Sequence, residues 1–495
     1  MNIDQLITAF IEKSVEIGDL DPLDAVYQTN QLLILLELPG YEKEELTELP
    51  ESRLEILDAL VEYAVDAGVI EDLDAYRDVL SSQIMDLVTP RPSEVNVLFW
   101  ENYEKSPELA TDTFFEMSKR NDYIKTRAIA QNIAFLHESD YGELQITINL
   151  SKPEKDPREI ELASKFKQST NYPANALVIE NEGYEGNLTH PGRSNHRIVR
   201  MDLGDDPWGL QYSPYAYYNE HSIFLAIEHR PMDVGPQAIR NLLEIISQFP
   251  HYFVGSNAGL PIVGGSILSH DHYQGGRHNF PIEEGDITYN FKMQDTPGVE
   301  AGIVKWPMSV IRLRSKEREK LAAAAIKVMK EWEEYSDESV GVHAYSGDEP
   351  HNAITPIARK NGDYYEIDMV LRNNRRSDEF PDGIFHPHPV VQHIKRENIG
   401  LIEVMGLAIL PPRLKDELYE VEQFLLGKVD AVEAMHQEWA NTLKENNQIT
   451  EENVHRVVEH AVGEVFLQVL KDAGVFKTDD TGQAAFIRFI EECLI

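Results

Sequence analysis

The sequence predicts an α+β protein in which helices lie at both ends of the chain and strands are grouped between them. Apolar residues recur at helical spacing near the N-terminus, alternate with polar residues in the middle of the chain, and return to helical spacing after Pro412. Segregation of helices from strands in this way is typical of α+β proteins. The 495 residues exceed the ~250–300 that one hydrophobic core usually supports, so we expect more than one packed unit.

The first third of the chain is predicted to be mainly helical. Residues 3–15 and 54–65 each place apolar side chains at intervals of three and four, which puts them on one helix face. Ser106 precedes Pro107, and this pair is typical of a helix start, because serine can cap the first turn and proline needs no hydrogen-bond partner there. We expect that helix to extend past Met117.

The middle of the chain is predicted to contain strands. In LQITINL, from Leu144, apolar and polar residues alternate with the two-residue period of a half-buried strand. Further strand candidates are ALVIE from Ala176, SIFLAIE from Ser222, HYFVGS from His251, PMSVIRLR from Pro307, DYYEIDMVLRN from Asp363 and IGLIEVMGLAIL from Ile399. Helices are predicted from Pro236, from Lys316 and over 414–426, 431–443 and 454–470.

These patterns suggest three regions along the chain. Residues 1–140 form a mainly helical N-terminal region, residues 141–345 a first mixed half, and residues 346–495 a second mixed half that ends in the C-terminal helices. We found no short tandem repeat and no low-complexity linker.

Composition excludes several classes of function. A formal net charge of −40 disfavours nucleic acids and anionic membranes as partners, because such partners are bound through many Lys and Arg contacts. Cys493 is the only cysteine, so the chain has no intrachain disulfide and no CxxC metal or redox site. The sequence carries no recognisable export signal and no apolar run of membrane-spanning length. A cytoplasmic protein is expected.

The segment GGSILSHDHYQGG, residues 264–276, carries the clearest chemical signal. Its glycines let backbone amides approach a ligand closely, and its serines add hydroxyl donors. In an extended strand the side chains of residues i, i+2 and i+4 lie on one face, so three polar side chains are expected to share one site. The candidate residues are Gly264, Gly265, Ser266, Ser269, His270, His272 and Gln274.

This combination favours phosphoryl or nucleotidyl transfer. Imidazole is a good nucleophile at neutral pH, and a covalent adduct on histidine divides one transfer into two displacements. An HxH pair is also a common pair of metal ligands, and isolated histidines are often ordinary core or surface residues. The amide-rich loop and the glutamine at i+4 favour transfer, because a metal site needs neither.

At these residues the sequence resembles the histidine triad superfamily, and its HxHxQ form resembles the transferase branch. Other segments are similar to the galactose-1-phosphate uridylyltransferases found in lactic acid bacteria and their relatives. The similar segments are YGELQITINLSKPEKDP from Tyr141, NLTHPGRSNHRIV from Asn187, SNAGLPIVGGSILSHDHYQGG from Ser256 and IKRENIGLIEVMGLAILPPRL from Ile394. The resemblance implies two histidine-triad-like halves with antiparallel sheets.

The resemblance also implies roles for individual residues. His272 would be the nucleophile, and the main-chain carbonyl of His270 would accept the proton of its other ring nitrogen. Gln274 would donate to an oxygen of the uridylyl group. Gly265 and Ser266 would hold the phosphates, and Asn257 would contact the nucleotide sugar; Ser269 competes with Ser266 for one role. Candidates for neutralising phosphate are Arg193, Arg197 and Arg277, although such arginines are often members of ion pairs.

No cofactor is clearly implied, and a structural metal is possible. The better-known class of these transferases builds a zinc site with paired cysteines, which this chain lacks. A second metal site of the family uses histidines of the C-terminal half, where His351, His386 and His388 are the candidates; a turn formed by HPHP is the alternative. The HPHP segment is not preceded by glycines and serines and has no glutamine at i+4, so His272 remains the preferred nucleophile.

The resemblance implies UDP-glucose and galactose 1-phosphate as substrates. UDP-glucose would uridylylate His272 and release glucose 1-phosphate, and galactose 1-phosphate would then leave as UDP-galactose, as in the Leloir pathway of galactose metabolism. A homodimer is expected from the family. The alternatives are another histidine-triad nucleotidyltransferase or phosphorylase, and a non-catalytic protein that binds nucleotide sugars.

Overall fold

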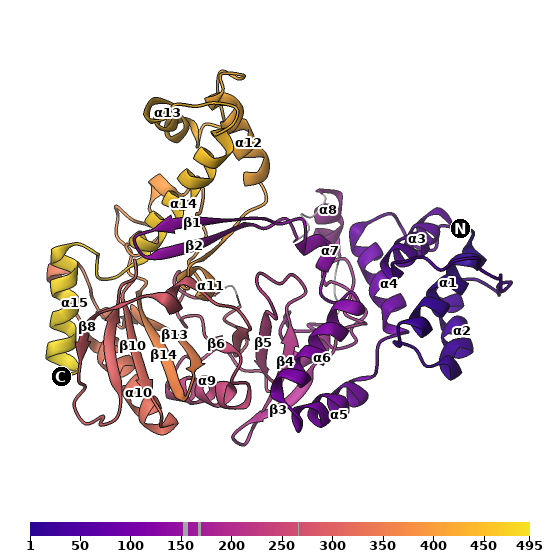
Figure 1. The fold of residues 1–495 in the computed structure, drawn as a ribbon, viewed down its shortest axis with the longest axis horizontal. Coiled ribbons are helices and arrows are strands. Elements are labelled where there is room, and N and C mark those ends of the chain that lie inside the picture. The colour runs from indigo at the N-terminus through magenta and orange to yellow at the C-terminus, as the bar shows by residue number, and fades with distance from the viewer. Residues whose placement is uncertain (152–156, 167–169, 266) are drawn as a thin grey trace. The chain divides into compact units, whose positions relative to one another are not determined.

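A computed structural model describes residues 1–151, 157–166, 170–265 and 267–495 of the chain (Figure 1). These residues form two compact units, each built from segments distant in sequence. The first unit comprises Met1–Arg127, Lys152–Ala216 and Ser222–His229, and the second comprises Ala128–Ser151, Tyr217–His221 and Arg230–Ile495. Helices and antiparallel sheets are both abundant, so the predicted α+β class is confirmed.

The first unit is mainly helical. Side chains of α1 to α4 enclose one apolar core, which includes Phe10, Leu60 and Ile84. The predicted start at Ser106 is confirmed, because its side chain accepts the Leu109 amide hydrogen at 3.1 Å. The helices of this unit are α1 (Ile3–Glu16), α2 (Ala25–Leu35), α3 (Arg53–Asp66), α4 (Asp74–Asp86), α5 (Pro92–Tyr103), α6 (Pro107–Arg120) and α8 (Pro157–Lys165). Helix α7 (Thr126–Ile129) spans the change to the second unit along the chain.

Three antiparallel strands complete the first unit: β3 (Val199–Leu203), β4 (Asp206–Tyr212) and β5 (Ser222–Ala226). The strand predicted from Ser222 is therefore confirmed. The strand predicted from Ala176 is wrong, because that segment forms turns and a short 3-10 helix, Ile179–Asn181. The Asn181 side chain donates to the carbonyls of Asn175 and Val178, both at 2.8 Å. Such local bonds satisfy backbone groups that a strand would pair with a neighbour.

The second unit contains an antiparallel sheet that includes the strand of the histidine motif. Every neighbouring pair in the following order is antiparallel. The order is β7 (His272–Gly276), β6 (Phe253–Gly255), β13 (Asn352–Asn361), β14 (Tyr364–Asn373), β10 (Val310–Ser315), β9 (Glu300–Val304) and β8 (Ile287–Phe291). Strands β11 (Tyr345–Ser346) and β12 (Glu349–Pro350) form a separate short hairpin.

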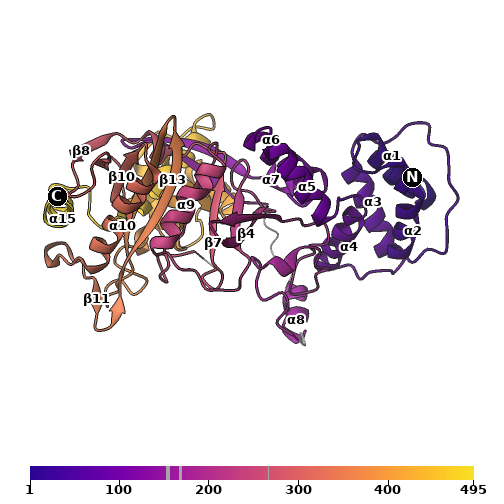
Figure 2. The same ribbon diagram turned by 90° about the horizontal axis from the view of Figure 1, so that it is seen from below.

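Helices cover this sheet and support a second, smaller sheet. Helices α9 (Pro236–Gln248) and α10 (Arg318–Glu334) pack on the strands around β13 and β14 (Figure 2). The smaller sheet consists of β1 (Ile133–Ser139), β2 (Gly142–Ile148) and β15 (Leu407–Leu410), and α14 (Val454–Ala473) packs against β1 (Figure 1). The remaining helices are α11 (Leu401–Val404), α12 (Leu414–Leu425), α13 (Gln437–Asn446) and α15 (Asp480–Cys493).

One apolar core joins the sheets and C-terminal helices of the second unit. It contains Ile146 of β2, Val310 of β10, Val370 of β14 and Phe466 of α14.

The strand predicted over IGLIEVMGLAIL is only half correct, because Leu401–Val404 is helical and the strand begins at Leu407. The Gly400 amide is held by Glu403 at 3.2 Å, which favours a helix start at that point.

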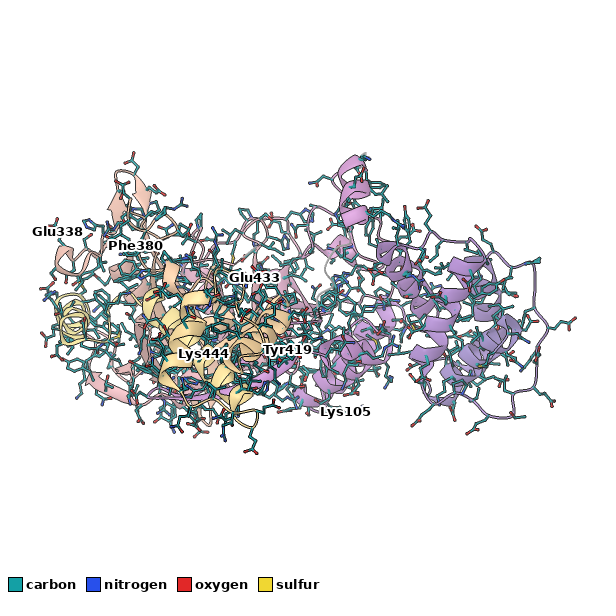
Figure 3. All side chains as sticks on the ribbon, turned by 90° about the horizontal axis from the view of Figure 1, so that it is seen from above. Lys105, Glu338, Phe380, Tyr419, Glu433 and Lys444 are labelled. Atoms are coloured by element: carbon teal, nitrogen blue, oxygen red, sulfur yellow. The ribbon has the colours of Figure 1, made fainter. Side chains whose placement is uncertain are left out.

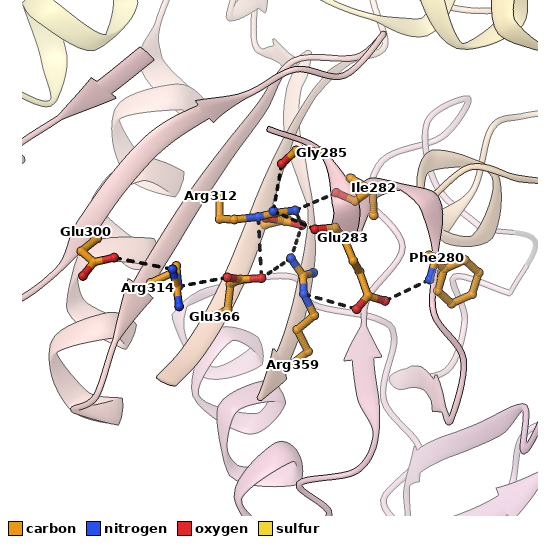
Figure 4. A network of polar contacts seen from close by, with 10 residues as sticks. Phe280, Ile282, Glu283, Gly285, Glu300, Arg312, Arg314, Arg359 and Glu366 are labelled. Atoms are coloured by element: carbon orange, nitrogen blue, oxygen red, sulfur yellow. Dashed lines mark hydrogen bonds and ion pairs between the residues drawn. The ribbon is translucent and has the colours of Figure 1, made fainter. Parts of the chain in front are cut away.

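A buried network of charges braces the large sheet (Figure 4). Arg312 of β10 donates to the carboxylate of Asp368 on β14 at 2.7 and 2.9 Å, and Arg359 of β13 contacts Asp368 at 2.9 Å. Glu366 also pairs with Arg359. Burial alone would raise the pKa of Asp368, but Arg359 and Arg312 outweigh it and lower that pKa below its usual value. The strands are therefore tied by ion pairs as well as by ladder bonds.

Among the helices that the structure describes, none combines the length and the apolar character needed to span a membrane.

Candidate active site

The loop before the histidine motif is packed so closely that glycine is required. A Cβ atom on Gly264 would lie 2.4 Å from the Ala258 carbonyl oxygen and 2.6 Å from that of Leu260, both backbone atoms. A Cβ atom on Gly265 would lie 2.6 Å from Nδ2 of Asn257. Glycine at these two positions therefore allows the loop to pack closely against itself. The sequence had suggested a different reason for these glycines, the close approach of a ligand.

His272 is the first residue of β7, and its ring is oriented by the backbone. Its Nδ1 atom lies 2.8 Å from the carbonyl oxygen of His270, the hydrogen bond that the sequence resemblance implied. A carbonyl can only accept, so Nδ1 carries the hydrogen and Nε2 presents its lone pair. His272 is 6% exposed, and burial lowers the pKa of its imidazole, which favours the neutral, nucleophilic form.

Only part of the predicted alternation lies in a strand. His272 and Gln274 are in β7, whereas His270 occupies the bend before it, so the expected strand over all three residues is wrong. His270 contributes its carbonyl to His272 from that bend. Within β7, the residues paired with β6 are Gln274, Gly275 and Gly276.

Gln274 is held by His221, a residue that the sequence did not identify. Nε2 of His221 lies 3.0 Å from Oε1 of Gln274. Burial lowers the pKa of His221 to about 4, so its imidazole is neutral and carries one ring hydrogen. The Tyr217 backbone amide donates to Nδ1 of His221, with a nitrogen–nitrogen distance of 3.5 Å. Nδ1 is therefore the acceptor, and the ring hydrogen is on Nε2. The Gln274 oxygen is thereby occupied, and its amide hydrogens are directed elsewhere.

The segment Tyr217–His221 is anchored along β7 by several contacts. The Tyr218 hydroxyl donates to the Gly275 carbonyl at 3.2 Å, and its ring stacks on His221 with centroids 4.4 Å apart. The Glu220 carboxylate accepts the Tyr252 hydroxyl at 2.6 Å and pairs with Arg277 at 3.1 Å. Arg277 thus helps to anchor this segment, although it was a sequence candidate for neutralising phosphate. These contacts together fix the position of His221.

Asn257 connects the loop to α11. Its Oδ1 atom accepts the Leu401 amide hydrogen at 2.8 Å, and its Nδ2 atom lies against Gly265. Asn257 is 5% exposed. Its contact with a nucleotide sugar stays a prediction.

The two serines are placed differently. Ser269 is exposed on the loop that enters β7. Ser266 lies outside the described residues, so the competition between them stays a prediction.

A cleft of about 270 Å³ opens beside Ile262 of the same loop. Arg376, Arg396 and Asn398 line it together with His386. The two guanidinium groups outnumber the one carboxylate of the lining, Asp382, so the cleft has local positive charge in a strongly acidic protein. Neither arginine could be identified from the sequence, because nothing in their spacing links them to the histidine motif.

Two candidate arginines belong to the first unit, whereas His272 belongs to the second. Arg197 donates to Asp86 at 2.6 Å and to the carbonyls of Pro90 and Ser194 at 2.6 and 2.8 Å. These contacts explain Arg197 as a structural residue. Arg193 lies over the ring of Tyr123, 5.5 Å from its centroid, and its role toward phosphate stays a prediction.

The three candidate metal ligands of the C-terminal half each have other partners. His351 lies between Asn374 at 2.8 Å and Ser346 at 2.7 Å. Nε2 of His388 is 3.0 Å from the Ile384 carbonyl, and its ring stacks on Phe380, which Figure 3 labels. His386 contacts Asn398 at 3.3 Å. Among the described residues, the one group with metal-ligand spacing contains none of the three.

Comparisons with known proteins assign the chain to a family. Residues 18–231 match the family model "Galactose-1-phosphate uridyl transferase, N-terminal domain", and residues 244–441 match the corresponding C-terminal domain. A galactose-1-phosphate uridylyltransferase of Ligilactobacillus salivarius is 54% identical over 489 residues, which cover 98% of each chain. One of Pediococcus pentosaceus is 58% identical over 468 residues, covering 94% of this chain and 95% of the relative.

A solved structure of yeast Ap4A phosphorylase Apa2 is a distant neighbour. It is 13% identical, covers 66% of this chain and 91% of its own, and has a TM-score of 0.33, which is too low to support an argument. The two family domains and the near full-length relatives are sufficient: the chain belongs to the galactose-1-phosphate uridylyltransferase family.

Proposed function

We propose that the protein transfers a uridylyl group from UDP-glucose to galactose 1-phosphate through a covalent adduct on Nε2 of His272. The observation that carries this proposal is the orientation of His272: its Nδ1 hydrogen is held by the His270 carbonyl, so the Nε2 lone pair is available. The two substrates are inferred from the relatives, which are galactose-1-phosphate uridylyltransferases.

In the first half-reaction, Nε2 of His272 attacks the α-phosphorus of UDP-glucose. A nitrogen–phosphorus bond forms, and the bond from phosphorus to the bridging oxygen breaks, which releases glucose 1-phosphate. The imidazole becomes positively charged, and the Nδ1–H group shares that charge with the His270 carbonyl at 2.8 Å. No proton needs to leave the ring.

In the second half-reaction, a phosphate oxygen of galactose 1-phosphate attacks the same phosphorus. The nitrogen–phosphorus bond breaks, UDP-galactose leaves, and His272 is regenerated. The Gln274 amide donates to a non-bridging oxygen in both steps, because its own oxygen is occupied by His221. The cleft lined by Arg376 and Arg396 offers cationic partners for the phosphate of a sugar phosphate.

The experiment is isotope exchange between UDP-glucose and labelled glucose 1-phosphate with no galactose 1-phosphate present. A ping-pong enzyme catalyses this exchange, because the first half-reaction is reversible by itself. His272→Asn should abolish it while circular dichroism stays unchanged. Absence of exchange in an enzyme that completes the full reaction would exclude the covalent route, and binding with neither reaction would indicate a nucleotide-sugar binding protein.

We also propose a homodimer, by analogy with the family.

A further inference from the structure

A group of side chains on the smaller sheet of the second unit has the spacing of a metal site. His137 lies on β1, and His460 and Glu464 lie on α14, which packs along β1 (Figure 1). One ligand atom from each residue lies within 4.8 Å of the other two. His460 and Glu464 are four residues apart, so their side chains project from the same face of the helix.

His137 is the fixed member of this group. It is 3% exposed, and its Nε2 atom is buried with no hydrogen-bond partner among the described residues. Oε1 of Glu464 is 3.0 Å from Nε2, within ion-pair distance, but the two groups are not aligned as in a good hydrogen bond. A ring nitrogen and a carboxylate oxygen at this separation are also spaced as neighbouring ligands around one cation would be.

Helix α14 makes room for His137 with a glycine. A Cβ atom on Gly463 would lie 2.2 Å from Cγ of the His137 ring and 2.4 Å from its Nδ1 atom. Glycine inside a helix costs about 1 kcal/mol relative to alanine, so its presence here needs a packing reason. The reason is the imidazole, which is seated directly against the helix backbone with Nε2 beside Glu464.

The other two members are exposed and can adjust. His460 and Glu464 are at the protein surface, and the rings of His137 and His460 are 5.0 Å apart and inclined by 77°. Small rotations of these side chains would bring all three atoms to the ~2.0–2.2 Å bond lengths of zinc. Water would complete the coordination from the solvent side.

We propose that His137, His460 and Glu464 form a binding site for Zn²⁺ that ties β1 to α14. Two imidazoles and one carboxylate are ligands suited to zinc and other borderline transition cations, and they are poor ligands for Mg²⁺ or Ca²⁺, which prefer oxygen. The site is built from residues that have no part in the proposed transfer reaction. Its role is structural.

The test measures zinc binding to the full-length protein after removal of metal with EDTA. Competition with a chromophoric zinc chelator should show one tight site per chain. His460→Ala and Glu464→Gln, both at exposed positions, should each weaken that affinity at least tenfold. Zn²⁺ should also raise the thermal midpoint of the wild type, because it binds only the folded state, and this increase should be lost in both variants.

The matched control lies five residues earlier on the same helix. His455 and Glu459 are also four residues apart, and their side chains approach to 3.2 Å, but they are not part of a three-ligand group. His455→Ala should bind zinc as the wild type does. The proposal is overturned if the metal-free protein takes up no zinc, or if His460→Ala and His455→Ala bind it equally well. Exchange activity of the metal-free protein should persist, which separates this test from that of the proposed function.

Discussion

The imidazole of His221 directs the side-chain amide of Gln274, with Nε2 of His221 3.0 Å from Oε1 of Gln274. A neutral amide can donate to a phosphoryl group only through its nitrogen, so the orientation of Gln274 decides whether it assists the reaction. His221 therefore acts as a positioning residue for Gln274, and it is 53 residues away in the sequence.

The first prediction concerns this pair. Gln274→Ala should slow uridylylation by a factor of order 10², as loss of an oxyanion donor does. His221→Ala should slow it less, because the amide remains but can turn. The double variant should be no slower than Gln274→Ala alone, since the two residues act as one unit. Pre-steady-state formation of the adduct measures all three rates.

A matched control is the pair His278 and Gln145, whose side chains approach to 2.7 Å in the same unit. His278→Ala removes a similar histidine–glutamine contact and should leave the rate of uridylylation within about threefold of wild type, which corresponds to less than ~1 kcal/mol in the barrier. Additive losses in the His221 and Gln274 variants would show that His221 acts independently of Gln274.

The second prediction is a pH profile. Protonation removes the lone pair of His272, and burial lowers the pKa of this imidazole below its usual 6.5. The acid limb of kcat/KM for UDP-glucose should therefore lie below pH 6.5, because the neutral form persists until the pH falls through the lowered pKa. UDP-glucose is the right substrate to vary, since a sugar monophosphate titrates near pH 6 itself. An acid limb centred at or above pH 6.5 would contradict a buried nucleophile.

The third prediction concerns the glycine loop. Gly264→Ala places a methyl group against two backbone oxygens that cannot move independently of the loop, so it should destabilise the protein by about 1–3 kcal/mol and reduce uridylylation. Gly259→Ala is the control in the same loop, because its methyl group would lie 3.4 Å from a Val234 methyl group, an ordinary contact. Chemical denaturation and exchange assays measure both effects. Equal behaviour of the two variants would refute the packing argument.

The fourth prediction concerns the charge network of Figure 4. Asp368→Asn leaves Arg312 and Arg359 buried without their shared carboxylate and should destabilise the protein by about 3–5 kcal/mol. Glu300→Gln removes an exposed contact of 3.7 Å with Arg314 and should change stability by less than about 0.5 kcal/mol. Urea unfolding compares the two variants.

The pH dependence of this network follows from the lowered pKa of Asp368. The folded protein holds the carboxylate ionised to lower pH than the unfolded chain does. Its contribution to stability is therefore complete above the unfolded pKa of about 3.9 and is lost as the pH falls through the lower folded value. Asp368→Asn should reduce the acid dependence of stability in that window. An unchanged acid dependence in this variant would contradict the assigned ion pairs.

Local sequence patterns predicted the helices and strands that are specified by contacts between residues close in sequence. Ser106 and Pro107 mark a helix start through contacts within one turn, and the alternation from Leu144 matches β2. The contact between His272 and His270 was implied by the family resemblance and not by local pattern, and the structure contains it. Helix α15 could have been found from the Asp479 cap, whose side chain accepts the Gly482 amide, and from its buried residues at helical spacing.

The features that were missed depend on contacts between distant segments. His221 reaches Gln274 because Tyr218 and Glu220 anchor the segment to β7, and no periodicity in the sequence reports this. The pattern from Ala176 is typical of a strand, but the Asn181 side chain holds the segment as a turn. The tight spacing of Gly264 against Ala258 and Leu260 also became apparent only from the fold.

The most direct measurement of the central claim is the intact mass of the protein after incubation with UDP-glucose alone, followed by peptide mapping of the modified residue. One uridylyl group should appear on His272, should decay slowly in water because Gln274 cannot transfer a proton, and should disappear rapidly on addition of galactose 1-phosphate. His272→Asn should acquire none. An adduct on His386 or His388, no adduct at all, or an adduct that water removes as fast as galactose 1-phosphate does would contradict the account.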